Sequence, residues 1–118
     1  MTRIGILLEQ GHIILIPIPF TDLSSTKRRP VILISNSTYH RSTQDMVVVA
    51  MTSQPAQTAY SFTITDADLV EGTLNRPGQV RADKIYTLAQ GLAIRIFGKV
   101  QPSILERIRL LFNEIIHT

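Results

Sequence analysis

The sequence predicts a mainly β domain, a small barrel of short strands with one α-helix packed on it at the C-terminal end. Short segments rich in β-branched residues recur between polar turns, which is typical of strands. Only the C-terminal segment shows the 3.6-residue spacing of an amphipathic helix. The chain has 118 residues, the size of one domain. We therefore expect residues 1–10 to be an N-terminal extension and residues 11–118 to form a single domain.

The first two strands are expected on either side of a polar loop. Residues 12–19 are rich in isoleucine and form the first strand, in which Pro17 and Pro19 cannot donate to a ladder. That end of the strand should therefore lie at a sheet edge or a bulge. Residues 21–27 are polar and serine-rich and indicate a loop, after which residues 30–35 form a continuous apolar second strand.

Four further strands follow along the chain. A third, buried strand is expected at residues 46–51, after a polar stretch. The fourth segment alternates apolar and polar side chains, so one of its faces should be buried and the other solvated. Turn residues separate the remaining segments. The fourth, fifth and sixth strands are expected at residues 60–64, 79–82 and 92–100.

The C-terminal helix is expected at residues 102–117. Its apolar residues recur along one stripe from Ile104 to Ile116, and Pro102 suits the first turn. Gln101 is a mediocre N-cap. A helix with one apolar stripe must cover that stripe, and the barrel is the surface available to it.

Composition excludes several classes of protein. The chain has no cysteine, which removes disulfides, thiolate nucleophiles and cysteine metal sites. His12, His40 and His117 are dispersed and have no partner at the spacing of metal ligands, so we expect neither a metal nor another cofactor. No apolar run is long enough to span a bilayer, and no signal peptide is recognised. We expect a cytoplasmic protein.

The charge balance favours anionic partners weakly. Twelve basic residues against nine acidic ones give a net charge of +3, an excess that nucleic-acid binders share with many ordinary domains. Nine of the twelve basic residues are arginine, whose planar fork matches a phosphate with two hydrogen bonds. Composition therefore points toward phosphates without establishing them.

A cationic triplet is the first candidate site. Lys27, Arg28 and Arg29 precede Pro30, which biases Arg29 toward extended backbone and gives its side chain a fixed origin. The triplet can contact a phosphate. The alternative is a solvated cationic loop.

Two further candidate sites lie at expected strand ends. Thr52 and Ser53 close the third strand with hydroxyls that either donate to a phosphate oxygen or make a turn hydrogen bond. Arg81 and Asp83 are two residues apart, so in an extended segment they share a face, and Asp83 can orient the guanidinium. An ordinary surface ion pair is the alternative reading of that pair.

An acidic cluster resembles a metal site only superficially. Asp66, Asp68 and Glu71 lack the glycine and the distal glutamate of a calcium loop. We expect these residues to start a turn.

A series of short motifs runs in order through nearly the whole chain. Each motif is weak alone, but their order and spacing are fairly specific. The motifs are residues 11–17 (GHIILIP), 19–23 (PFTDL), 29–30 (RP), 35–36 (SN), 51–53 (MTS), 72–74 (GTL), Pro77, 80–85 (VRADKI) and 98–100 (GKV). This series resembles the PemK/MazF family of toxin–antitoxin ribonucleases.

The resemblance implies an SH3-like barrel of the CcdB/PemK type, a homodimer, and a type II toxin that cleaves single-stranded RNA, such as mRNA, at specific sequences without a metal. Such cleavage needs a 2′-hydroxyl to attack the adjacent phosphorus, proton transfer, and donors for the developing charge. By resemblance, Arg29 contacts the scissile phosphate and is also a candidate for proton transfer, although a guanidinium is a poor base, so the assignment of the general base stays open. Thr52 hydrogen-bonds the same phosphate by resemblance. Lys27, Arg28, Ser53, Arg81 and Asp83 would position RNA or assist catalysis. The expected protein partner is a cognate antitoxin with an acidic segment that occupies the RNA groove.

Two positions depart from the family pattern. His12 stands where the family usually has an acidic residue, and Gly78 stands where a serine often follows the proline. The first departure bears on loop support or substrate preference, and the second on an RNA-facing turn. Neither removes Arg29 or Thr52.

Two rival functions use the same fold. A CcdB-like gyrase poison acts by binding, but its action depends on a tryptophan-containing tail, and this chain has no tryptophan. The other alternative is a barrel that binds nucleic acid or protein without catalysis, for which His12 and the modest charge are the hints.

Overall fold

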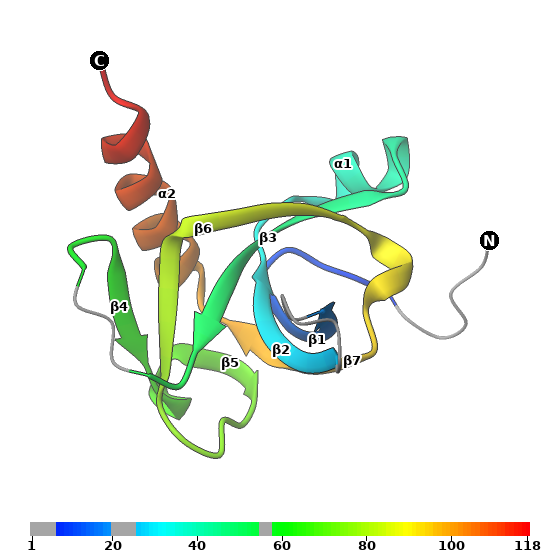
Figure 1. Cartoon of the computed structure of the whole chain (residues 1–118), viewed down its shortest axis with the longest axis horizontal. Coiled ribbons are helices and arrows are strands. Elements are labelled where there is room, and N and C mark those ends of the chain that lie inside the picture. The colour runs from blue at the N-terminus through cyan, green and yellow to red at the C-terminus, as the bar shows by residue number, and fades with distance from the viewer. Residues whose placement is uncertain (1–6, 20–25, 55–57) are drawn as a thin grey trace.

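The structure, a computed structural model, describes residues 7–19, 26–54 and 58–118. These residues form one strongly curled antiparallel sheet with the order β4-β6-β3-β2-β1-β7-β5, and a C-terminal helix, α2, lies beside β6 (Figure 1). The predicted architecture, mainly β with one C-terminal helix, is confirmed. The strands are β1 (His12–Pro19), β2 (Thr26–Leu33), β3 (Asp45–Thr52), β4 (Ser61–Ile64), β5 (Leu69–Gly72), β6 (Gly78–Ala89) and β7 (Arg95–Val100). The helices are α1 (Ser37–Ser42), α2 (Pro102–Ile116) and the short 3-10 turns η1 (Asp66–Asp68) and η2 (Gln90–Leu92).

The central strands are buried on both faces. Neighbouring residues of β1, Ile13 and Ile14, belong to different core clusters, and both are fully buried. The first cluster lies under α2, and the second lies against the η2 side, where Ala93 is buried. This arrangement explains why these segments are continuous apolar runs rather than alternating ones.

The prolines of β1 lie where the ladder with β7 has ended. β1 pairs with β2 along its whole length, but with β7 only from His12 to Leu15. Pro17 and Pro19 come after the last β7 pair, so neither has to donate a hydrogen bond on that side. The edge position predicted for this end is confirmed.

The cationic triplet belongs to a strand, so the loop predicted to extend through residue 27 is wrong at this end. β2 begins at Thr26, and Lys27, Arg28 and Arg29 pair with residues 18, 17 and 16 of β1. The long partner strand supplies pairing that outweighs the polar character of these residues. Residues 20–25 of the predicted loop lie outside the described residues.

The other segments differ from the sequence predictions mainly in length. β6 spans twelve residues, whereas a strand at residues 79–82 was expected, because its polar second half continues to pair with β3. The acidic residues Asp66 and Asp68 lie in the 3-10 turn η1, where Thr65 and Asp68 form a capping box. The turn is as expected, but Glu71 lies in β5, a short strand that the sequence analysis missed. The polar stretch after β2 contains the short helix α1.

Only the first half of α2 is buried against the sheet. Ile104 and Ile108 are buried, with Leu105 and Leu111 packed beside them. Four large apolar residues of the second half are exposed, namely Leu110, Phe112, Ile115 and Ile116, and in Figure 1 this end of α2 projects away from the sheet. Pro102 starts the helix as predicted, and Gln101 makes no side-chain cap but donates to the Ala67 carbonyl at 3.0 Å. Within the described residues, no helix is long and apolar enough to cross a membrane.

Part of the expected N-terminal extension contacts the barrel. Leu8 is buried in the second core cluster, and Glu9 accepts a hydrogen bond from the Lys99 ammonium at 2.8 Å. This ion pair lowers the pKa of the Glu9 carboxyl. The Gly11 N–H donates to the Leu33 carbonyl at 2.7 Å, which fixes the start of β1.

Candidate active site

Two pockets meet just beyond the end of the β2–β3 ladder, whose last pair is Val31 with Ala50. The first has a volume of about 400 Å³ and the second about 360 Å³. Arg29 and Pro30 of β2 and Met51 and Thr52 of β3 line both of them. The two residues predicted to be catalytic, Arg29 and Thr52, therefore stand at the junction of the pockets.

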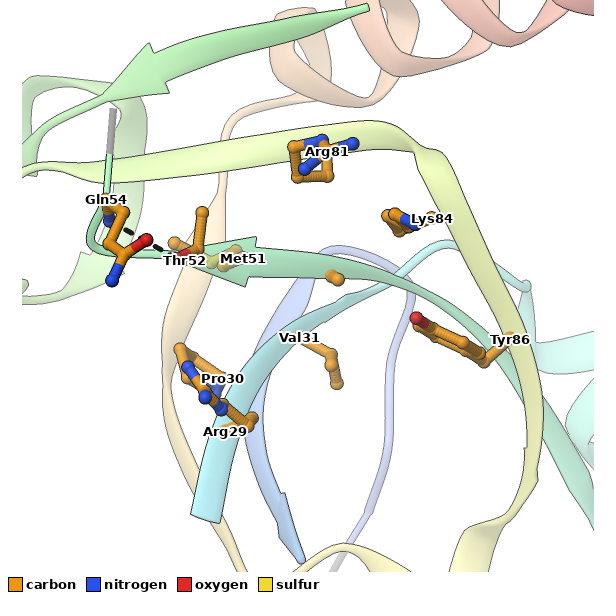
Figure 2. A pocket seen from close by; sticks show the side chains of 10 residues that line it. Arg29, Pro30, Val31, Met51, Thr52, Gln54, Arg81, Lys84 and Tyr86 are labelled. Atoms are coloured by element: carbon orange, nitrogen blue, oxygen red, sulfur yellow. Dashed lines mark hydrogen bonds between the residues drawn. The ribbon is translucent and has the colours of Figure 1, made fainter. Parts of the chain in front are cut away.

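The first pocket spans three adjacent strands. Figure 2 shows Arg29 on β2 and Arg81 on β6, on either side of β3, with Thr52 between them in the strand order. Lys84 and Tyr86 complete the β6 side. Three cationic side chains line this pocket, and the described part of its lining contains no carboxylate, so an anion such as a phosphodiester suits it.

A bulge in the β3–β6 ladder positions the β6 side chains that line the first pocket. Val49 of β3 pairs with Ile85, yet the next residue, Ala50, pairs with Arg81. Residues 82–84 are thus extra on β6, and such a bulge re-aims the side chains beside it. Ala82 fixes the bulge, because it is fully buried and its N–H donates to the Tyr60 carbonyl at 2.9 Å.

Arg81 is held by Asp83 through a two-pronged ion pair. Nε donates to Oδ1 and an outer guanidinium nitrogen donates to Oδ2, each at 2.9 Å. The hydrogen bonds from Arg81 lower the pKa of the Asp83 carboxyl and the same contact raises the pKa of Arg81. The pairing predicted from their spacing is present, and the pair keeps Arg81 charged and oriented at the pocket.

Thr52 makes the turn hydrogen bond that was one of its two expected roles. The Gln54 N–H donates to Thr52 Oγ1 at 3.2 Å, shown as a dashed line in Figure 2. Because the hydroxyl oxygen accepts this bond, its proton stays available for donation. The turn therefore orients the hydroxyl without using up its donor.

The second pocket lies on the other side of Arg29 and Thr52. Arg28 and Ser53 line it together with Leu15, Phe97 and the turn at residues 73–78. Its floor is more apolar than that of the first pocket, and its rim carries arginines and an amide.

The structure brings together most of the residues predicted for the site. Arg29, Thr52 and Arg81 line the first pocket, Arg28 and Ser53 line the second, and Asp83 is paired with Arg81. Lys27 is the residue of β2 before Arg28. Within the described residues, no three side chains of the metal-ligating types come together as a metal site.

Sequence analysis missed two polar residues of the first pocket, Gln54 and Tyr86, and included Lys84 only as part of the motif at residues 80–85. Lys84 and Tyr86 are two residues apart in one strand, and this spacing was the available signal. Gln54 follows the end of β3, where no pattern marks it.

His12 supplies the kind of acceptor that an acidic residue would supply at its position. It is buried, and its Nδ1 accepts the Glu9 N–H at 2.9 Å. Burial lowers the pKa of His12, which keeps the ring neutral at physiological pH. The departure from the family pattern thus preserves local support for the start of β1, away from both pockets.

Comparison with known proteins gives a family and a fold. A sequence profile described as "PemK-like, MazF-like toxin of type II toxin-antitoxin system" matches residues 9–116. No curated protein sequence matches the chain. Similar solved structures include an endoribonuclease bound to its cognate antitoxin from a Mycobacterial species, with a TM-score of 0.74 and 20% identity over 92% of this chain and 93% of that one. MazE–MazF from Deinococcus radiodurans gives a TM-score of 0.76 and 18% identity over 92% and 95%. The Mycobacterium tuberculosis toxin MazF-mt6 gives a TM-score of 0.69 and 20% identity over 87% and 93%.

Proposed function

Because the chain belongs to the family of PemK-like, MazF-like toxins of type II toxin–antitoxin systems, we propose that it is an endoribonuclease that cleaves single-stranded RNA without a metal ion. The observation that carries the proposal is the meeting of Arg29 and Thr52, from adjacent strands, at the junction of two pockets, with the oriented Arg81 across β3. An unpaired RNA strand suits such a groove, because its base edges are free to be recognised.

The proposed reaction is an internal transesterification. The 2′-oxygen of one nucleotide forms a bond to the adjacent phosphorus as the bond from phosphorus to the 5′-oxygen of the next nucleotide breaks. The 2′-hydroxyl gives up its proton and the departing 5′-oxygen gains one. The products are a 2′,3′-cyclic phosphate and a 5′-hydroxyl, and the balance needs neither water nor an oxidant.

In this mechanism the protein stabilises the charge that develops on the phosphoryl oxygens. The Arg29 guanidinium and the Thr52 hydroxyl donate hydrogen bonds to those oxygens, and Arg81, oriented by Asp83, adds its remaining N–H donors. In this proposal Arg29 acts as a hydrogen-bond donor, because a guanidinium carries N–H donors and no acceptor. Asp83 acts on RNA through Arg81, which it orients.

We also propose a cognate antitoxin and a symmetric homodimer as protein partners. An acidic antitoxin segment that lies in the groove pairs its carboxylates with Arg29 and Arg81 and competes with RNA. A second copy of the chain covers the apolar end of α2, where Phe112, Ile115 and Ile116 are exposed.

The test is cleavage of a mixed single-stranded RNA by purified protein in excess EDTA, with both new ends mapped. We expect 2′,3′-cyclic phosphates and 5′-hydroxyls, and DNA of the same sequence should stay intact. Arg29→Ala protein purified in parallel controls for contaminating ribonuclease. If RNA stays intact while DNA gyrase is inhibited, the chain is a poison that acts by binding. If RNA binds but stays intact, it is a barrel without catalysis.

A further inference from the structure

We propose that the second pocket binds one nucleobase next to the scissile phosphate and sets the sequence preference at that position. This inference rests on the proposed function and deepens it. It assigns residues outside the predicted site, above all Asn75 and Arg76, to the choice of substrate.

The position of the pocket carries the first step. A phosphate held by Arg29 and Thr52 lies on the wall that the two pockets share. A phosphodiester has a nucleoside on each side, so one neighbouring nucleoside faces the first pocket and the other faces the second. A volume of about 360 Å³ lies within the range of small-molecule sites, of about 300–1,000 Å³.

The chemistry of the lining is that of a base pocket. Leu15, Leu74 and Phe97 are half-buried and offer apolar surface for the faces of a base. Arg28, Asn75 and Arg76 are exposed at the rim, where they can reach its polar edge. The first pocket instead has three cations, which suit the charged backbone.

One wall of the second pocket is held in place before any ligand arrives. The Leu74 N–H donates to the Asp66 carboxylate at 2.5 Å, which ties the turn at residues 73–78 to η1. Behind this turn, Gly72 has a φ of +85°, and a Cβ there would lie 2.2 Å from the Phe97 carbonyl oxygen. Only glycine allows β5 and β7 to approach so closely. Through its hydrogen bond with the Leu74 N–H, Asp66 of η1 helps to shape the pocket.

The rim predicts which bases are preferred. Arg28 and Arg76 are donors only, and Asn75 both donates and accepts. The described lining contains no acidic side chain to accept from an exocyclic amino group. Bases that present a carbonyl oxygen should therefore be preferred to adenine at this position.

The experiment compares the cleavage profiles of three proteins on a randomised single-stranded RNA. They are the wild type, the double variant Asn75→Ala/Arg76→Ala, and Arg109→Ala, which removes an exposed arginine of α2 that is paired with Glu106 away from both pockets. Thermal melting checks that each is folded. We expect the double variant to lose a preference against adenine of ~10-fold at one position beside the cut, with other positions unchanged. Arg109→Ala should keep the wild-type profile.

A binding arm separates this inference from the proposed function. The probes are 2′-O-methyl RNA hexamers, which cannot be cleaved by 2′-oxygen attack, with each of the four bases placed in turn at one position. The wild type should bind the adenine hexamer most weakly, and the double variant should bind all four alike. If the wild type cleaves RNA and the double variant keeps its preferences in both arms, the base pocket is overturned and the proposed function stands. If the wild type does not cleave, the proposed function fails and the binding arm decides the base pocket.

Discussion

The groove formed by the two pockets beside Arg29 and Thr52 is a polar, cationic surface, whereas the C-terminal end of α2 is an apolar one. On the groove, Arg29, Thr52 and Arg81 come from three adjacent strands and converge on one pocket. On the second half of α2, Phe112 and Ile116 stand exposed, the latter by 58%. The groove is lined by cationic side chains and suits an anion, whereas the helix end presents exposed apolar side chains. We infer that the groove binds RNA or the acidic antitoxin segment that competes with it, and that the helix end binds a second copy of this chain.

The two surfaces also differ in how they are held. Arg81 is fixed by its ion pair with Asp83 and by the bulge of β6. The first half of α2 is fixed by the buried Ile108 and by Arg107, whose guanidinium carbon lies 4.1 Å from the centroid of the Phe62 ring. In the second half of α2 no residue is buried. Substitutions in the groove should therefore change RNA cleavage, and substitutions in the second half of α2 should change dimer formation.

The largest expected effect is that of Arg29→Ala on catalysis. Loss of one charge donor to the transition state should reduce RNA cleavage by ~10²-fold or more. The melting temperature should change little, because Arg29 belongs to neither hydrophobic core cluster. Initial cleavage rates and a thermal melt measure both. Arg109→Ala is the matched control, and a variant at Arg29 that cleaves like this control would place the site elsewhere.

Ile115→Asp tests the proposed dimer interface at the end of α2. A carboxylate in the centre of an apolar interface would be desolvated without a partner, so the variant should be a monomer where the wild type is a dimer. Light scattering at micromolar concentration measures the mass. Glu114→Gln, one residue away and also exposed, should leave the dimer intact. A monomeric wild type would refute the role given to this end of α2.

Asp83→Asn should have a smaller effect on cleavage, about tenfold, because Arg81 stays in place but loses the partner that orients it. The pair also adds a pH dependence to stability. Since Arg81 lowers the pKa of Asp83, its stabilisation is present above the unfolded carboxyl pKa of about 3.9 and is lost as the pH falls through the lower folded value. Melting curves of both proteins should differ slightly at pH 7 and converge below about pH 4. Convergence near neutral pH would exclude this pair as the cause.

The smallest expected effect is that of Gly78→Ser, which restores the residue common in the family. A Cβ at this position would lie 2.5 Å from the terminal methyl of Met51, which lines both pockets. Methionine is flexible and can move aside, so the cost in unfolding free energy should stay below ~1.5 kcal/mol. Denaturant unfolding measures it. A loss of several kcal/mol would show that the groove floor is rigid at Met51.

The sequence predicted the sheet and the helix where hydrophobic pattern decides them. β1 was predicted with its observed bounds. Pro17 and Pro19 indicated that the C-terminal end of this strand lies at a sheet edge. The hydrophobic pattern failed where strand pairing outweighs composition. β2 includes the cationic triplet, and the polar half of β6 is a strand because it pairs with β3.

The candidate site was predictable in its charges but not in its shape. Arg29, Thr52 and Arg81 were named from the sequence, and the spacing of Arg81 and Asp83 predicted their contact. Phe97 was not predicted, because its place at the second pocket depends on the close approach of β5 to β7. Such non-local geometry leaves no periodic signal along the chain.

The most direct test of the account is cleavage of one RNA oligonucleotide with and without a single 2′-deoxy substitution on the 5′ side of its mapped cut, in EDTA. The account predicts that the all-ribose strand yields a 2′,3′-cyclic phosphate and a 5′-hydroxyl and that the substituted strand stays whole at that bond. Cleavage of the substituted strand at the same bond, or products that carry 5′-phosphates, would contradict it.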